Sequence, residues 1–281
     1  MTPVVYPRIA ELRAAVQAAR GAGKSIGVVP TMGALHEGHA ELIRRARAET
    51  GYVVVTIFVN PIQFDRPEDL AKYPRDLATD VQLCERMGAD AVFAPSAEEM
   101  YPGELRTQVE VTGVSEKLEG EFRPGHFKGV ATVVAKLLNI AAPDRAYFGE
   151  KDAQQLAVIQ KMVVDLNMPV EIVPVATVRE SDGLAMSSRN RLLTDEQRRA
   201  APVLYRALCV ARDRLLAGAS PAEARAAALV TLAGTPEMSV QYLEVADAAT
   251  MSPVGRVSGP VRVAAAVWLG KVRLIDNVRF N

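Results

Sequence analysis

Residues 52–60 constrain the fold of this chain more than any other stretch, because they form a nearly unbroken apolar run. The run contains Val53, Val54, Val55, Ile57, Phe58 and Val59, and Pro61 ends it. A strand with one solvent-exposed face alternates polar and apolar residues, whereas a continuous apolar run is typical of a parallel strand covered on both faces. The run therefore predicts a parallel sheet between helices, with Asn60 and Gln63 at the carboxyl end of this strand.

Strand and helix patterns alternate through the first two thirds of the sequence. Strands are expected at residues 26–31, 52–60, 90–94, 108–112, 146–148 and 170–178, and helices at residues 9–20, 39–49, 76–87, 127–142 and 152–166. This alternation predicts the α/β class, with a Rossmann-like, doubly wound parallel sheet. Such sheets bind ligands at the carboxyl ends of their strands, near the point where the strand order reverses.

The pattern changes beyond residue 180. Thr194 and Gln197 fit a capping box in front of a long helix, and a second helix is expected to begin near Pro221. Strands are expected at residues 239–245 and 261–274. Because two helices followed by strands indicate an α+β arrangement, we expect a Rossmann-like domain at residues 1–180 and a smaller C-terminal α+β domain at residues 181–281.

Residues 30–39, which read Pro-Thr-Met-Gly-Ala-Leu-His-Glu-Gly-His, connect a strand to a helix. His36 and His39 would face the same space at the helix N-terminus, where unpaired backbone N–H groups and the helix dipole favour anions. The turn therefore predicts phosphate binding. For a single histidine a core or capping role is the alternative, and a metal pair would lack a completing cysteine or carboxylate cluster within the motif.

Three further loops carry polar residues whose roles the sequence leaves open. Lys151 stands at the start of a helix, where its charge opposes the dipole unless an anion lies nearby. Asp152 and Gln155, however, also fit a capping box. Residues 187–189, Ser-Ser-Arg, could form a simple turn, and residues 60–63 could form a strand-ending turn. Their common placement on loops expected at one sheet edge favours a functional role.

The composition excludes several classes of protein. Thirty-three basic and 33 acidic residues give a formal net charge of zero, so the chain lacks the basic excess of general nucleic-acid binders. No stretch approaches the roughly 18 apolar residues of a membrane span, and the N-terminus lacks an apolar signal segment. Cys84 and Cys209 are isolated, which indicates free thiols. We expect a cytoplasmic enzyme that acts on small molecules.

Several blocks together resemble the pantoate–β-alanine ligase family of the nucleotidylyltransferase superfamily, the pantothenate synthetases. The blocks are residues 30–39, residues 60–64 with Glu68, Asp69 and residues 73–75, residues 126–134, residues 148–155, and residues 179–190. They occur in the expected order over essentially the whole chain, and no motif position departs from the family pattern. The resemblance implies that pantoate carboxylate attacks the α-phosphorus of ATP, and that β-alanine then displaces AMP from pantoyl adenylate.

The resemblance also implies roles for individual residues. The residues implied in ATP binding are Met32, Gly33, Ala34, Leu35, His36, Glu37, Gly38, His39, Gly149, Glu150, Lys151, Asp152, Val178, Met186, Ser187, Ser188 and Arg189. Pantoate and β-alanine would contact Asn60, Gln63 and Gln155. His39, as the proton donor of the family pattern, would act with His36, Lys151 and Arg189 on the developing negative charge. The first domain would bind the nucleotide and pantoate, and the second would cover the active site.

The resemblance further implies ATP as a substrate, Mg²⁺ on the ATP phosphates and a homodimer. The protein ligands of the metal cannot be named from the sequence. Two alternatives remain: a related nucleotidylyltransferase that transfers AMP to a phosphate-bearing acceptor, and an ATP-binding regulator without turnover.

Overall fold

The structure is a computed structural model that describes residues 2–64 and 67–280. The chain divides into two compact units. The first unit comprises Met1–Thr112, Arg123–Glu150 and Val158–Ala176, and the second comprises Gly113–Phe122, Lys151–Ala157 and Thr177–Asn281.

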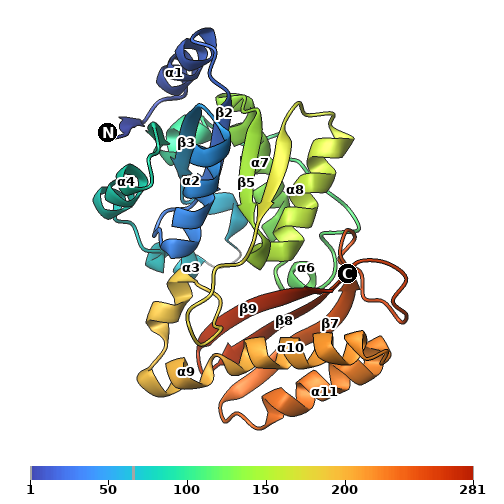
Figure 1. The fold of residues 1–281 in the computed structure, drawn as a ribbon. Coiled ribbons are helices and arrows are strands. Elements are labelled where there is room, and N and C mark those ends of the chain that lie inside the picture. Colours follow the sequence, from blue (N-terminus) through green and yellow to red (C-terminus); the bar gives the residue numbers. More distant parts are fainter. Residues whose placement is uncertain (1, 65–66, 281) are drawn as a thin grey trace. The chain divides into compact units, whose positions relative to one another are not determined.

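The first unit contains a six-stranded sheet in which every described pair of neighbouring strands is parallel (Figure 1). The strands are β1 Val4–Tyr6, β2 Ile26–Thr31, β3 Tyr52–Ile57, β4 Ala91–Phe93, β5 Arg145–Gly149 and β6 Glu171–Val175, in the spatial order β1-β4-β3-β2-β5-β6. The strand order reverses between β2 and β5. The predicted α/β class with a doubly wound parallel sheet is therefore confirmed.

Helices cover both faces of this sheet. The longer helices of this unit are α1 Ile9–Gly21, α2 Glu37–Glu49, α4 Leu77–Arg86 and α7 His126–Ala141, and its shorter ones are α3 Pro67–Lys72, α5 Ala97–Met100 and η1 Pro61–Gln63. The 3-10 turn η2 Glu150–Asp152 and helix α8 Ala153–Asp165 each contain residues of both units. On β3, Val53 and Val55 pack into one cluster with residues of α2 and α4, while Val54 between them is also fully buried. Burial of both sets explains the continuous apolar run.

Some boundaries differ from the sequence prediction. Strand β3 ends at Ile57, three residues before Asn60, so Asn60 lies in the loop that follows. The strand predicted at residues 108–112 is wrong. There the backbone N–H of Val109 donates to Thr132 Oγ1, a side chain of α7, over 2.9 Å, so this donor is satisfied by a helix side chain in place of a neighbouring strand. Strand β1 was not predicted, because three residues carry too short a pattern.

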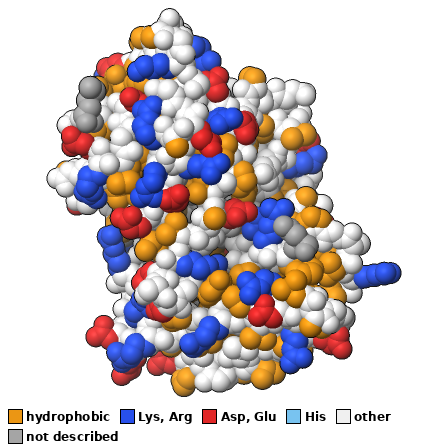
Figure 2. All heavy atoms as spheres, in the orientation of Figure 1, with side chains coloured by type: hydrophobic (Ala, Val, Ile, Leu, Met, Phe, Trp, Pro, Cys, Tyr) orange, Lys and Arg blue, Asp and Glu red, His pale blue; other side chains and the backbone are white. Residues whose placement is uncertain are grey.

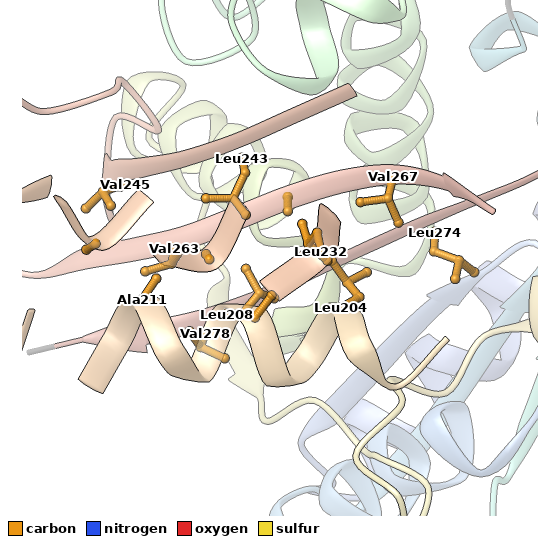
Figure 3. Close-up of a cluster of buried hydrophobic side chains, with 14 of the residues drawn as sticks. Leu204, Leu208, Ala211, Leu232, Leu243, Val245, Val263, Val267, Leu274 and Val278 are labelled. Atoms are coloured by element: carbon orange, nitrogen blue, oxygen red, sulfur yellow. The ribbon is translucent and has the colours of Figure 1, made fainter. Parts of the chain in front are cut away.

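The second unit contains a three-stranded antiparallel sheet with helices packed against it. Its strands are β7 Met238–Asp247, β8 Val261–Leu269 and β9 Val272–Phe280, and its helices are α6 Glu119–Phe122, α9 Asp195–Ala200, α10 Val203–Leu216 and α11 Pro221–Ala233, with the 3-10 turn η3 Ser188–Leu192. Leu204 and Leu208 of α10 lie in one buried cluster with Leu243 and Val263 of the sheet (Figure 3). This apolar cluster is the core of the unit.

Two features of the second unit correct the sequence prediction. The capping box of Thr194 and Gln197 forms as predicted, yet the helix it starts ends at Ala200, because Pro202 cannot supply a backbone N–H to continue it. The strand predicted at residues 261–274 is two strands. Gly270, with φ +57°, forms the turn between them, a conformation that disfavours other residues.

Charged side chains of both signs are interspersed over the face that Figure 2 draws. Within residues 2–64 and 67–280, none of the helices combines the length and the apolar character needed to cross a membrane.

Candidate active site

The loop that carries the two histidines begins at the switch point of the sheet. It leaves the carboxyl end of β2 at Thr31, and β5, the neighbour across the switch point, ends at Gly149. Because the two strands are parallel, both carboxyl ends lie at the same edge of the sheet. Gly149 and Glu150 therefore leave the sheet beside the histidine loop, at the edge where doubly wound sheets bind their ligands.

His36 and His39 form a reciprocal capping box at the start of α2. The Nδ1 atom of His36 accepts from the backbone N–H of Gly38 over 3.1 Å, and the Nδ1 atom of His39 accepts from the backbone N–H of His36 over 3.3 Å. The two ring centroids lie 4.2 Å apart. An Nδ1 atom that accepts carries no hydrogen, so each neutral ring holds its hydrogen on Nε2. Both imidazoles are thus donors at Nε2.

A buried carboxylate holds the backbone of this loop. Asp80 on α4 is 3% exposed and accepts from the backbone N–H groups of Ala34, over 3.0 Å, and Leu35, over 2.7 Å. Gly33 and Ala34 both have positive φ, at +81° and +52°, and Thr31 Oγ1 accepts from the N–H of Gly33. Ala34 adopts a left-handed backbone conformation that residues with a Cβ seldom adopt. The hydrogen bonds to Asp80 and Thr31 offset the free energy that this conformation costs.

Asp80 is a site residue that was not predicted, although the sequence carries a signal for it. The buried residues of α4 are Asp80, Leu83 and Cys84, which are spaced three and four apart on the side of the helix that faces the core. A carboxylate on the apolar side of an amphipathic helix needs a partner, because an unpaired buried charge is costly.

The structure brings Asn60 and Gln63 together with Met32. Asn60 is 1% exposed, and its Nδ2 donates to Gln63 Oε1 over 3.0 Å. Gln63 Nε2 in turn lies 2.9 Å from Met32 Sδ, which it can use as an acceptor. The hydroxyl of Tyr101, a residue not predicted from the sequence, donates to Asn60 Oδ1 over 2.7 Å.

His126, the third histidine of the sequence, lies next to this pair of amides. It is the first residue of α7 and is 8% exposed. Its Nδ1 lies 2.9 Å from the carbonyl oxygen of Gln63, and its Nε2 lies 3.1 Å from Arg123 Nη1. His126 therefore fixes the backbone of the loop that carries Gln63.

In the second unit, Lys151, Ser187 and Arg189 line one pocket. The other lining residues are Leu184, Ala185, Asn190, Leu204, Arg273, Leu274, Ile275 and Asp276. The carbonyl oxygen of Lys151 accepts from Asn277 Nδ2 over 3.0 Å, and Lys151 Nζ lies 3.8 Å from Asp152 Oδ1. Two residues predicted from separate loops, Lys151 and Arg189, therefore share this pocket.

A bidentate ion pair supports this pocket. Arg179 Nη1 and Nη2 donate to the two carboxylate oxygens of Asp276 over 2.6 and 2.9 Å, and the guanidinium carbon lies 3.8 Å from the ring centre of Tyr205. Burial raises the pKa of the Asp276 carboxyl, while the Arg179 guanidinium opposes this shift. The paired geometry favours the charged form of both groups.

The other predicted site residues lie on the segment of residues 178–189 and in helix α8. The N–H of Met186 donates to the carbonyl of Val178 over 3.0 Å, so these two residues face each other across a narrow turn. Ser187 Oγ accepts from the N–H of Arg189 at the start of η3, where Ser188 is the first residue, so the simple-turn alternative has a structural basis. Gln155 lies in the first turn of α8.

Helix α8 follows the 3-10 turn η2, in which Asp152 is the last residue. A capping role of Asp152 and Gln155 and a role in substrate binding therefore both stay predictions. Among residues 2–64 and 67–280, no group of three or more His, Cys, Asp or Glu side chains is placed to hold a metal ion.

The fold and the histidine turn define an α/β protein in which helix α2, capped by two imidazoles, begins after β2 at the switch point of a doubly wound parallel sheet. Residues 4–279 match the family described as pantoate-beta-alanine ligase. The chain belongs to this family.

Relatives and solved structures agree with this assignment. The chain is 54% identical to a pantothenate synthetase of Moorella thermoacetica over 271 residues, which cover 96% of each chain. It is 54% identical to a pantothenate synthetase of Cereibacter sphaeroides over 276 residues, covering 98% of this chain and 99% of the relative. A pantothenate synthetase structure from Thermus thermophilus superimposes with a TM-score of 0.93, at 48% identity and 98% coverage of both chains.

A pantoate-beta-alanine ligase structure from Francisella tularensis, described as complexed with beta-gamma ATP and beta-alanine, superimposes with a TM-score of 0.82. It is 34% identical to this chain, and the match covers 98% of this chain and 97% of the other.

Proposed function

We propose that this protein is an ATP-dependent ligase that joins pantoate to β-alanine to form pantothenate, releasing AMP and pyrophosphate. The observation that carries the proposal is the family match over residues 4–279, together with a turn at which two imidazole N–H donors stand at a helix N-terminus. The named relatives support the substrates, and the Francisella relative is described with a form of ATP and with β-alanine.

The proposed reaction has two steps. In the first, a carboxylate oxygen of pantoate attacks the α-phosphorus of ATP, the bond to pyrophosphate breaks, and pantoyl adenylate forms. Negative charge develops on the phosphoryl oxygens and on the leaving pyrophosphate, so preorganised donors that strengthen as this charge grows accelerate the step.

The histidine turn would supply donors for this charge. His36 and His39 each present an Nε2–H, because their Nδ1 atoms accept from backbone N–H groups. The first turn of α2, which includes Glu37 and Gly38, adds the positive end of the helix dipole. Since Asp80 holds the loop rigid, these donors need little rearrangement during the reaction.

The second set of donors would come from the pocket of the second unit. Lys151 and Arg189 bring positive charge, and Ser187 and Ser188 begin a 3-10 turn whose first backbone N–H groups could donate to a phosphate. We propose that Val178 and Met186, whose backbones face each other, contact the base of the nucleotide. Removal of one such charge typically lowers a rate by roughly 10²–10³.

The amides would hold pantoate. Gln63 and Gln155 carry side chains that can both donate and accept, which suits a substrate with hydroxyl groups and a carboxylate. Asn60, whose Nδ2 donates to Gln63 Oε1, would act on pantoate through Gln63. A neutral amide also leaves the carboxylate nucleophilic, whereas a bound guanidinium would pair with its charge.

In the second step, the amine of β-alanine attacks the acyl carbon of pantoyl adenylate. The amide bond forms, the bond to AMP breaks, and the amine loses a proton. AMP leaves as an anion, so the donors that stabilise the first transition state also serve here.

We also propose that ATP reacts as its magnesium complex, because a divalent cation would offset the negative charge of the triphosphate.

The experiment that tests this function is incubation of the protein with ATP, pantoate and β-alanine, followed by detection of pantothenate and AMP. Pantoate-dependent exchange of pyrophosphate into ATP, without β-alanine, tests the adenylate. Exchange that requires a phosphate-bearing acceptor would favour another nucleotidylyltransferase, and ATP binding without release of AMP would favour a regulator.

A homodimer and a cytoplasmic location are also part of this proposal. Light scattering on the purified protein measures the first, and fractionation of the source cells measures the second.

A further inference from the structure

A chain of hydrogen bonds runs through the buried polar residues of the first unit. The Tyr101 hydroxyl donates to Asn60 Oδ1 over 2.7 Å, and Asn60 Nδ2 donates to Gln63 Oε1 over 3.0 Å. Gln63 Nε2 then faces Met32 Sδ at 2.9 Å. Tyr101 is the C-cap of α5 and lies 41 residues from Asn60 in sequence, so this contact depends on the tertiary fold.

A backbone carbonyl sets the direction of this chain. Asn60 Nδ2 also donates to the carbonyl oxygen of Gly129 over 3.2 Å. That oxygen can only accept, so a flipped Asn60 amide would place two acceptors against each other. The amide is therefore oriented with Nδ2 toward Gly129 and Gln63, and with Oδ1 toward Tyr101.

Gly129 lies so close to the backbone of η1 that no side chain fits at this position. A Cβ at this position would fall 2.5 Å from the carbonyl oxygen of Ile62 and 2.7 Å from Gln63 Cα. Any larger residue would push α7 away from η1 and lengthen the hydrogen bond to Asn60. Glycine thus keeps the orienting carbonyl in place.

Tyr101 is held as a donor. Its ring packs against Phe58, with 6.0 Å between centroids, and Lys136 Nζ lies 5.3 Å from the ring centre. A phenol keeps its proton at neutral pH, and burial raises the pKa of the Tyr101 hydroxyl further above its ordinary value. Asn60 Oδ1 can only accept, and the hydroxyl therefore donates to it.

Gln63 receives its orientation from this chain. Its Oε1 is engaged by Asn60, which leaves the two hydrogens of Nε2 for Met32 Sδ and for a ligand. We propose that Tyr101 is a positioning residue which, through Asn60, holds the Gln63 amide with its N–H toward an oxygen atom of pantoate. This inference rests on the proposed function. With the reverse orientation, the amide oxygen would meet the oxygens of an anionic substrate and repel them.

The test is the conservative variant Tyr101→Phe, which removes one hydroxyl and keeps the ring. The KM for pantoate should rise about tenfold, the scale of a single neutral hydrogen bond, while the KM values for ATP and β-alanine stay unchanged. Tyr147→Phe is the matched control: its buried ring carries a hydroxyl bound to Glu49, outside the chain of hydrogen bonds, and its removal should leave the pantoate KM unchanged.

A double-mutant cycle separates this role from a general effect on folding. Asn60→Asp keeps the shape but cannot donate to Gly129 or Gln63, so it should raise the pantoate KM further. If Tyr101 acts through Asn60, the double variant should be no worse than Asn60→Asp alone. Additive effects, an unchanged pantoate KM in Tyr101→Phe, or an equal rise of all three KM values would each overturn the proposal.

A measurement without substrate keeps the two proposals distinct. The side-chain amide hydrogens of Asn60, followed by NMR, should exchange with solvent about tenfold faster in Tyr101→Phe than in the wild type. Equal exchange rates would overturn the positioning role even in an active enzyme. Failure of the wild type to form pantothenate would instead overturn the proposed function.

Discussion

The backbone N–H of His36 donates to the Nδ1 atom of His39 over 3.3 Å. In a typical capping box this acceptor is a Glu or Gln side chain at the third position of the helix. Here an imidazole fills the position, so one nitrogen caps the helix while the other keeps its hydrogen. Structural and chemical roles are thus divided between the two nitrogens of a single ring.

This division predicts different results for two substitutions of His39. His39→Ala removes the His39 half of the capping box and the Nε2 donor, and should lose about 1 kcal/mol of stability and roughly 10²–10⁴ in the rate of adenylation. His39→Gln restores the usual capping partner, so it should lose a similar rate and keep its stability. Urea unfolding and single-turnover formation of pantoyl adenylate measure the two effects. Near wild-type adenylation by either variant would contradict the role of the imidazole.

Asp80 provides a second prediction. Asp80→Asn leaves one acceptor oxygen for the N–H groups of Ala34 and Leu35 and turns an NH₂ group toward a donor. The variant should lose about 1–3 kcal/mol of stability and should raise the KM for ATP, because the loop is no longer held. Asp76→Asn, at the exposed cap of the same helix, is the control and should leave the KM for ATP unchanged. Equal ATP KM values in the wild type and Asp80→Asn would show that the loop does not need this carboxylate.

The sheet and the histidine turn were accessible from the sequence because their signals are local. The apolar run at residues 52–60 and the spacing of His36 and His39 each lie within a dozen residues. The missed contributors, Asp80 and Tyr101, act over 45 and 41 residues of sequence. The periodicity of a sequence does not reveal contacts between residues so far apart in the chain. For Asp80 the only local indication was a carboxylate on the apolar side of its helix. For Tyr101 there was no local indication.

The errors in the fold have a related cause. Residues 108–112 have strand-like composition, yet Val109 is paired with a helix side chain that the local pattern cannot reveal. The hairpin at Gly270 was missed because apolar residues continue on both sides of its turn. Pattern indicates that a segment is extended, whereas the partner that satisfies its backbone is a property of the whole fold.

Lys151 gives a third prediction. Lys151→Ala should fold with unchanged stability and lose roughly 10²–10³ in adenylation, since it removes a charge proposed to act on the phosphates. Lys161→Ala is the control, because Lys161 is an exposed lysine of α8 that pairs with Asp165. A normal adenylation rate for Lys151→Ala, or an equal loss for Lys161→Ala, would refute the assignment.

Gln155 distinguishes a substrate contact from a helix cap. Gln155→Ala should raise the KM for pantoate and leave the melting temperature nearly unchanged, because a side chain that contacts the substrate, unlike a helix cap, contributes little to folding. Thermal melting and pantoate kinetics test the two interpretations together. A fall of several degrees with unchanged kinetics would show that the side chain is structural.

Cys84 predicts a pH dependence of stability. Burial raises the pKa of its thiol to about 12, from an ordinary value of 9.0. Between these values the unfolded chain loses the proton while the folded chain retains it, so stability is fully present below about pH 9 and falls as the pH rises toward 12. Cys84→Ala removes this contribution, so its unfolding free energy should fall less steeply, by up to about 1.4 kcal/mol per pH unit. Urea unfolding at about pH 8, 9 and 10 measures the difference, and parallel curves for the two proteins would mean that the thiol ionises equally in both states.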